Sequence, residues 1–135
     1  MVATVSTGSA TDQPDPALPL RQRLGDALRV AMKARDRVAV SALRSALAAM
    51  DNAEAVDRAA AVDERLGIEQ IPVGVGAAEV ERRVLTPAQL EHIVRAEVTD
   101  REAAAREYDL AGRPERAERL RGEVGVLSAY LPDPT

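Results

Sequence analysis

The sequence contains no cysteine, no phenylalanine and no tryptophan, and its only aromatic residues are Tyr108 and Tyr130. Without cysteine there can be no disulfide, no thiolate nucleophile and no zinc site with sulfur ligands. Without large aromatic side chains, the core must be built from Leu, Val, Ile and abundant Ala, and Ala is the strongest helix former. These absences favour an all-α fold before any periodicity is considered.

Long apolar runs are also missing. No stretch approaches the roughly 18 consecutive apolar residues that indicate a membrane-spanning helix. The first residues, MVATVSTGSATDQPDP, have neither the basic nor the apolar region of a secretory signal. We expect a soluble, cytoplasmic protein that does not engage a membrane.

Groupings typical of catalysis are missing too. His92 is the only histidine, and its helical neighbours offer no partner at metal-ligand or acid–base spacing. The Gly74-Val-Gly76 sequence could open a dinucleotide-binding loop, but Glu79 stands where the third glycine is required. The sequence predicts no catalytic, metal-binding or cofactor-binding residue and no cofactor, and therefore a non-enzymatic protein.

Apolar periodicity predicts about four helices arranged as two antiparallel hairpins. Residues 1–18 are rich in Ser, Thr, Pro, Gly and Asp and are expected to be a disordered tail. Residues 19–135 are expected to form one helical domain, which divides into a first hairpin (19–54), a linker loop (55–84) and a second hairpin (85–132). Asp36 is expected to cap the second helix, whose end is uncertain because residues 59–65 could continue it.

The second hairpin has the clearest signals. Thr86, Pro87 and Gln89 predict a capped start for a long third helix that runs to about residue 111, and Gly112 fits the left-handed residue that ends it. Gly122 and Gly125 lie inside the fourth helix, where close approach to a neighbour would explain them. Three pairs are expected on the exposed side of the third helix: Glu91–Arg95, Glu97–Arg101 and Glu102–Arg106.

Charge is unevenly distributed. Residues 20–50 carry seven basic and two acidic side chains, whereas the whole chain has a net charge of −4. A basic hairpin on an acidic protein could bind phosphate, and the predicted contacts are Arg29, Lys33, Arg37 and Arg44. The alternative is an ordinary solvated face on a protein with 17 arginines and one lysine. No aromatic residues interleave with these cations, which argues against base stacking.

Two segments resemble the GatB/YqeY family of small bacterial proteins. The first segment carries an Ala-Met-Lys corner, a Leu-Arg pair and an Asn-x-Glu end, at Ala31 to Asp36, Leu43-Arg44 and Asn52 to Glu54. The second segment carries Arg101, Gly112-Arg113, Glu118, Glu123 and the closing Tyr130-Leu131-Pro132.

The resemblance implies a relation to the tail of the B subunit of the tRNA-dependent amidotransferase, which helps convert misacylated Glu- or Asp-tRNA with ammonia from glutamine. Family members are often labelled with carbon–nitrogen ligase activity with glutamine as amide donor. The amidotransferase tail is associated with tRNA contact and not with the chemistry. Full-length members continue past Tyr-Leu-Pro into a second three-helix domain, so the end at Thr135 leads us to expect the helical domain without that tail domain.

Two functional hypotheses follow. The first is an accessory helical module that binds tRNA. The second is a protein–protein interaction or self-association module without a nucleic-acid role, which would use an Ala-rich helical face or the groove at Gly122 and Gly125.

Overall fold

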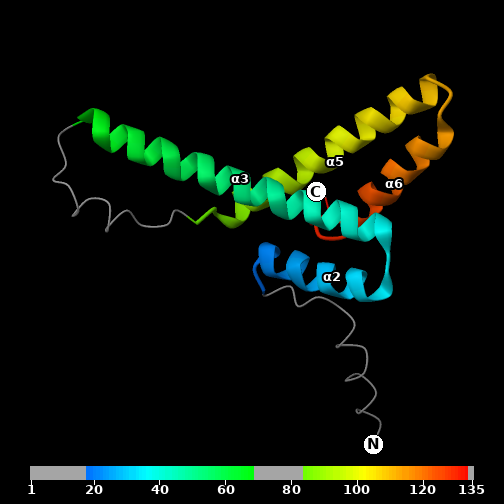
Figure 1. Ribbon diagram of the computed structural model, residues 1–135, viewed down its shortest axis with the longest axis horizontal. Coiled ribbons are helices and arrows are strands. Elements are labelled where there is room, and N and C mark those ends of the chain that lie inside the picture. The colour runs from blue at the N-terminus through cyan, green and yellow to red at the C-terminus, as the bar shows by residue number, and fades with distance from the viewer. Residues whose placement is uncertain (1–17, 69–83, 134–135) are drawn as a thin grey trace, which may run out of the picture.

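A computed structural model describes residues 18–68 and 84–133, and all the regular secondary structure within them is α-helical. The helices are α2 (Leu20–Ala34), α3 (Arg37–Ile68), α5 (Pro87–Leu110) and α6 (Pro114–Ser128) (Figure 1). The predicted all-α fold is confirmed. No helix in these two stretches is both long enough and apolar enough to cross a membrane.

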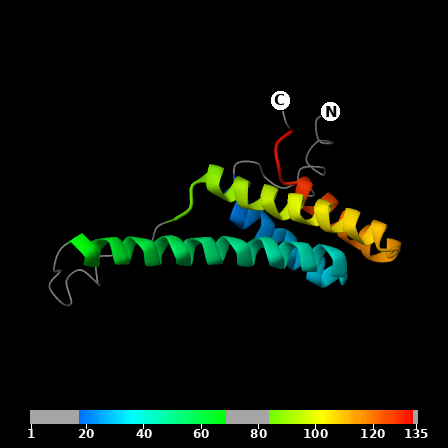
Figure 2. The same ribbon diagram turned by 90° about the horizontal axis from the view of Figure 1, so that it is seen from above.

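The helices form two antiparallel hairpins, as predicted. Helix α2 packs on α3, α5 packs on α6, and the second hairpin lies across the first mainly through α3 and α6. The C-terminal half of α3 extends beyond the other helices in both ribbon views (Figures 1 and 2). The packed part of the molecule is therefore centred on the N-terminal half of α3.

The extent of α3 corrects one prediction. Residues 55–68 are helical and do not belong to a linker loop, so α3 has 32 residues. The predicted long third helix is α5, with 24 residues. The alanines at 53, 55 and 59–61 favour helix strongly enough to outweigh Asn52 and Asp57. The rest of the predicted loop, 69–83, and residues 1–17 of the predicted tail lie outside the described residues.

The predicted start of α5 is confirmed. The hydroxyl of Thr86 accepts a hydrogen bond from the amide of Gln89 at 3.1 Å, and the Gln89 side chain accepts one from the amide of Thr86 at 2.8 Å. This reciprocal pair satisfies two amides that the helix itself cannot. Gly112, with φ of 76°, ends the helix, because the amide of Arg113 then reaches the carbonyl of Tyr108 at 2.8 Å.

The core is aliphatic and lies where the two hairpins cross. Its largest fully buried side chains come from all four helices: Leu24, Leu43, Met50, Val94 and Leu127. Small buried alanines let the helices approach closely, among them Ala42 and Ala46 of α3, Ala105 of α5 and Ala117 of α6.

The two glycines of α6 differ in their surroundings. A Cβ at Gly122 would lie 3.3 Å from Cγ1 of Val38 on α3, so the predicted close approach is confirmed there. A Cβ at Gly125 would meet nothing within 4 Å, so the same prediction is wrong for that residue. Gly122 therefore marks the point at which α6 packs against the start of α3.

Candidate nucleic-acid interface

The turn between α2 and α3 is built around a left-handed residue. Arg35 has φ of 60°, and no other described residue besides Gly112 has positive φ. The amide of Asp36 donates to the carbonyl of Ala31 at 2.9 Å, and the amide of Arg35 donates to that of Met32 at 3.2 Å. This pattern ends α2 in the same way as Gly112 ends α5, but with an arginine at the position that glycine favours.

Asp36 then starts α3. One oxygen of its carboxylate accepts from the amide of Ala39 at 3.1 Å, which confirms its predicted capping role. The first amides of α3, those of Arg37 and Val38, have no partner within the helix. The N-terminal end of the longest helix therefore presents a partial positive charge at this turn.

An open cavity of about 670 Å³ lies at the turn. Arginines from the turn and from successive turns of α3 line it together with a hydroxyl and two apolar side chains: Arg35, Arg37, Arg44, Ser41, Met32 and Val40. We call these six residues, with Lys33, the basic corner. One guanidinium nitrogen of Arg44 lies 4.0 Å from the sulfur of Met32, which links the two helices across the cavity.

The cations of the basic corner differ from other arginines of the protein in their ion pairing. Within the described stretches, the four cations of the corner, Lys33, Arg35, Arg37 and Arg44, form no ion pair. Arg21, by contrast, pairs with Asp51 at 2.6 Å and with Glu54 at 3.1 Å. Residues 32–44 hold four basic side chains and one acid, Asp36, whose carboxylate caps α3. The corner is thus locally positive on a protein whose net charge is negative.

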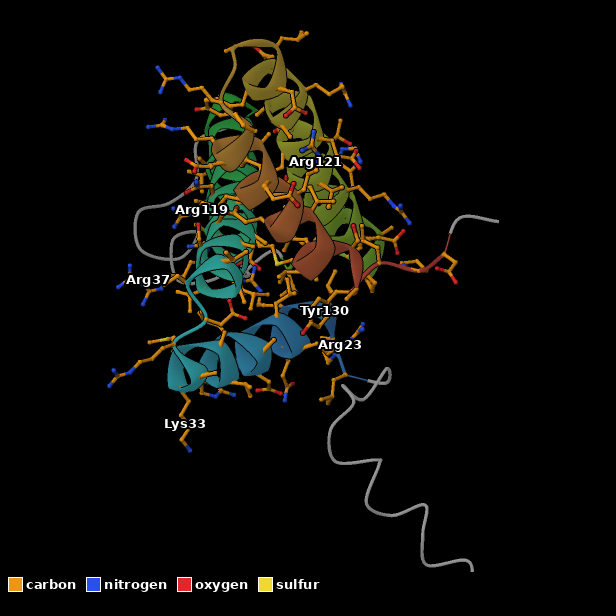
Figure 3. The ribbon with its side chains drawn as sticks, turned by 90° about the vertical axis from the view of Figure 1, so that its right-hand side faces the viewer. Arg23, Lys33, Arg37, Arg119, Arg121 and Tyr130 are labelled. Atoms are coloured by element: carbon orange, nitrogen blue, oxygen red, sulfur yellow. The ribbon has the colours of Figure 1, made fainter. Side chains whose placement is uncertain are left out.

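The four residues predicted for phosphate contact do not all meet. Arg37 and Arg44 line the cavity together, one on each of two turns of α3. Lys33 extends from the end of α2 away from the bundle, whereas Arg37 extends sideways from the start of α3 (Figure 3). Arg29 forms an ion pair with Asp26 one turn earlier on α2, and it does not line the cavity.

Sequence reasoning missed two polar members of the corner. Arg35 is one of the seven basic residues counted between residues 20 and 50. Periodicity alone could not show that its own left-handed conformation ends α2 there and places it at the cavity beside α3. Ser41 lies four residues after Arg37 and three before Arg44, a spacing that places all three on one face of a helix. That spacing was a usable signal.

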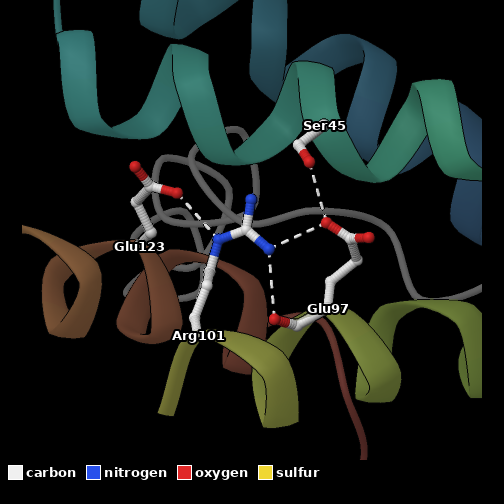
Figure 4. Close-up of polar contacts among 4 residues, drawn as sticks. All are labelled: Ser45, Glu97, Arg101 and Glu123. Carbon is white, nitrogen blue, oxygen red and sulfur yellow. Dashed lines mark hydrogen bonds and ion pairs between the residues drawn. The ribbon is translucent and has the colours of Figure 1, made fainter. Parts of the chain in front are cut away.

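A second polar cluster joins three helices in the interior (Figure 4). The Nε–H of Arg101 donates to Glu123 at 2.7 Å, and another guanidinium N–H donates to the carboxylate of Glu97 at 2.8 Å. The same Glu97 oxygen accepts from the hydroxyl of Ser45 on α3 at 2.8 Å. Glu97–Arg101 was predicted to be an exposed pair, and that is wrong, because these side chains are only 19% and 13% exposed.

The cluster holds Arg101 in its charged form. Burial lowers the pKa of Arg101, but its hydrogen bonds to Glu123 and Glu97 and the charges of both carboxylates outweigh burial, so the pKa is raised above its ordinary value. An arginine held this way between two carboxylates donates hydrogen bonds and cannot exchange protons near neutral pH. We therefore interpret the cluster as structural.

An open groove lies at the opposite end of α2. It has a volume of about 840 Å³ and is lined mainly by apolar side chains from the ends of three helices, among them Leu18, Pro19, Val84, Pro87 and Tyr130. The guanidinium of Arg23 lies 5.6 Å from the ring centroid of Tyr130, and its buried Nε has no hydrogen-bond partner in the described part. Val84 at the rim is 74% exposed.

His92 is exposed on α5. Between residues 18 and 68 and between 84 and 133, no group of three or more His, Asp or Glu side chains is placed to hold a metal ion.

The fold and surface define an all-α module of two crossed hairpins with a basic corner at one turn. Residues 74–135, just under half of the chain, match the family model described as Yqey-like protein. This stretch of the chain is thus Yqey-like, which confirms the resemblance across α5, the Gly112 turn and α6. No curated protein matches the chain. The basic corner precedes the matched stretch, so its function must be argued from its own geometry.

Proposed function

We propose that this chain is a non-enzymatic accessory module, related to the tail of the tRNA-dependent amidotransferase B subunit, that binds tRNA in the cytoplasm through its basic corner. The family label of glutamine-dependent carbon–nitrogen ligase would then describe the process it assists and not a reaction on this chain.

The observation that carries the proposal is the set of cations at the α2–α3 turn that form no ion pair within residues 18–68 and 84–133. An exposed arginine already paired with a carboxylate must give up that partner to bind phosphate. Among the residues that the structure describes, Arg37, Arg44 and Arg35 have no such partner to give up, and they surround a cavity beside the positive end of α3. Guanidinium groups are well suited to bidentate contact with phosphate oxygens.

The alternative is a protein-interaction module. The apolar groove around Tyr130, with exposed Val84 at its rim, supports this second function because apolar clefts of this kind accept side chains of a partner. The Gly122 surface supports it less, since Val38 of the chain's own α3 already packs there.

Titration of the full chain with labelled total tRNA, followed by fluorescence anisotropy at two salt concentrations, tests the proposal. Four phosphate contacts would weaken binding on the order of 100-fold between about 50 and 200 mM salt, by the slope for counterion release from duplex nucleic acid. Light scattering and a pull-down on the same preparation test the alternative. Absence of tRNA binding at low salt, together with a stable dimer or a protein partner, would replace the proposal with the interaction module.

A further inference from the structure

The surface around the start of α3 includes a cation from the second hairpin. Gly122 of α6 lies against Val38, the second residue of α3, so this part of α6 lies beside the first turn of α3. Arg119 precedes Gly122 by three residues and therefore shares its face of α6. In Figure 3, Arg119 and Arg37 lie along the same edge of the molecule, with Lys33 beyond them.

Arg119 is exposed and has no ion-pair partner among the described residues, although acids surround it on α6. Glu118 pairs with Arg121, and Glu123 is bound to Arg101 in the interior. Arg121, two residues further on, is also exposed but pairs with Asp109 of α5. The two arginines thus differ in pairing while sharing charge, exposure and helix.

The aromatic side chains that could stack on bases lie elsewhere. Tyr108 is near the α5–α6 turn, where the guanidinium of Arg116 lies 5.8 Å from its ring centroid. Tyr130 lies in the groove at the other end of α2 and contacts Arg23. No third aromatic residue exists in the sequence. Binding of single strands commonly relies on stacking, whereas double-stranded RNA is recognised by shape and by its backbone.

From these observations, and on the basis of the proposed tRNA-binding function, we infer that the RNA-binding face runs from the basic corner across α3 to Arg119 of α6 and takes a double-helical stem of RNA, not a single strand. The cations come from α2, the turn, α3 and α6. Helix α2 packs on α3, and α6 packs on α3 where Gly122 lies against Val38. Because the helices that carry these cations are packed together, their positions along the surface are fixed, which suits the regular backbone of a duplex better than a flexible strand.

The test uses the full chain and two labelled RNAs of equal length, a hairpin with a stem of about one helical turn and a strand that cannot pair. Affinity is measured against salt concentration for the wild type, Arg119→Gln and Arg121→Gln, with circular dichroism as a check on folding. We expect tighter binding of the stem. Arg119→Gln should reduce the salt slope for the stem by about 1, the loss of one phosphate contact, and Arg121→Gln should leave the slope unchanged.

Equal or stronger binding of the unpaired strand would overturn the inference, as would equal slopes for Arg119→Gln and Arg121→Gln. If the stem binds and only the corner variants Arg37→Gln and Arg44→Gln weaken it, this inference fails while the proposed function stands. If neither RNA binds at low salt, both fail.

Discussion

The Nε–H of Arg101 on α5 donates a 2.7 Å hydrogen bond to the carboxylate of Glu123 on α6, in an interior where these side chains are 13% and 8% exposed. Through Glu97 the same guanidinium reaches Ser45 on α3. Three helices thus share one polar junction beside an otherwise aliphatic core, and the junction links the second hairpin to the first.

Replacement of Arg101 should destabilise the protein strongly. Arg101→Met leaves two carboxylates facing each other in the interior without a cation, a change that costs about 3 kcal/mol. Arg95→Met is the matched control, because Arg95 pairs with Glu91 at the surface and should contribute less than about 1 kcal/mol. Urea unfolding followed by circular dichroism gives both free energies. Equal losses of stability in the two variants would show that the junction around Arg101 contributes no more than a surface ion pair.

Substitutions at the two turn residues with positive φ, Arg35 and Gly112, should change stability in opposite directions. Arg35→Gly should stabilise the fold by about 0.5–1 kcal/mol, because glycine adopts positive φ without the steric cost that arginine has. Gly112→Ala should destabilise it by about 1 kcal/mol for the converse reason. Thermal unfolding of both variants checks this. Since Arg35 lines the corner cavity, Arg35→Gly should also weaken tRNA binding, a combination that a merely structural residue would not produce.

The glycines of α6 provide a matched pair. Gly125→Ala should stabilise the protein by about 1 kcal/mol, because alanine is the better helix former and its methyl group meets nothing within 4 Å. Gly122→Ala has the same helix preference, but its methyl group would lie 3.3 Å from Val38 and force α6 away from α3. We expect Gly122→Ala to leave stability almost unchanged or to lower it. Equal stabilisation by both would contradict the close packing described here.

High pH should destabilise the protein through ionisation of Tyr130. Burial raises the pKa of Tyr130 above its ordinary 10.0, while the nearby charge of Arg23 lowers it in part. A tyrosine is neutral when protonated, so a raised folded-state pKa means that stability is complete below pH 10.0 and is lost as the pH rises through the folded pKa. Urea unfolding at pH 9 and pH 11 should show a smaller loss in Tyr130→Phe than in the wild type. An equal loss in both would remove Tyr130 as a cause.

Much of the fold was predictable because its signals are local. Thr86 with Gln89, Gly112 and Asp36 each act within a few residues of the chain, and each behaves as its sequence pattern indicates. The end of α3 was not predictable in this way. The alanines in this segment favour helix and its Asn and Asp residues disfavour it. The helix propensity of the segment becomes clear only when it is summed over all of these residues.

The candidate site was only partly predictable for a different reason. The charge balance drew attention to the α2–α3 turn and to Arg37 and Arg44, which line one cavity there, since charge can be counted along the chain. The Asp26–Arg29 pair could have been found in the same way, because the two residues are three apart on one helix. The position of Arg119 beside the start of α3 could not, because Arg119 lies 75 residues beyond Arg44 in the chain. Likewise, the spacing of Glu97 and Arg101 is that of an exposed helical pair. Only the fold shows that Glu123 and Ser45 contact them in the interior.

The central claim is that the cations of the basic corner bind tRNA. The most direct measurement compares two double variants that each remove two exposed arginines, Arg37→Gln with Arg44→Gln and Arg29→Gln with Arg121→Gln, of which only the second pair is engaged with carboxylates. We predict that the corner variant lowers the salt slope of tRNA binding by about 2 while the control keeps the wild-type slope. Equal slopes for the two double variants would contradict the account.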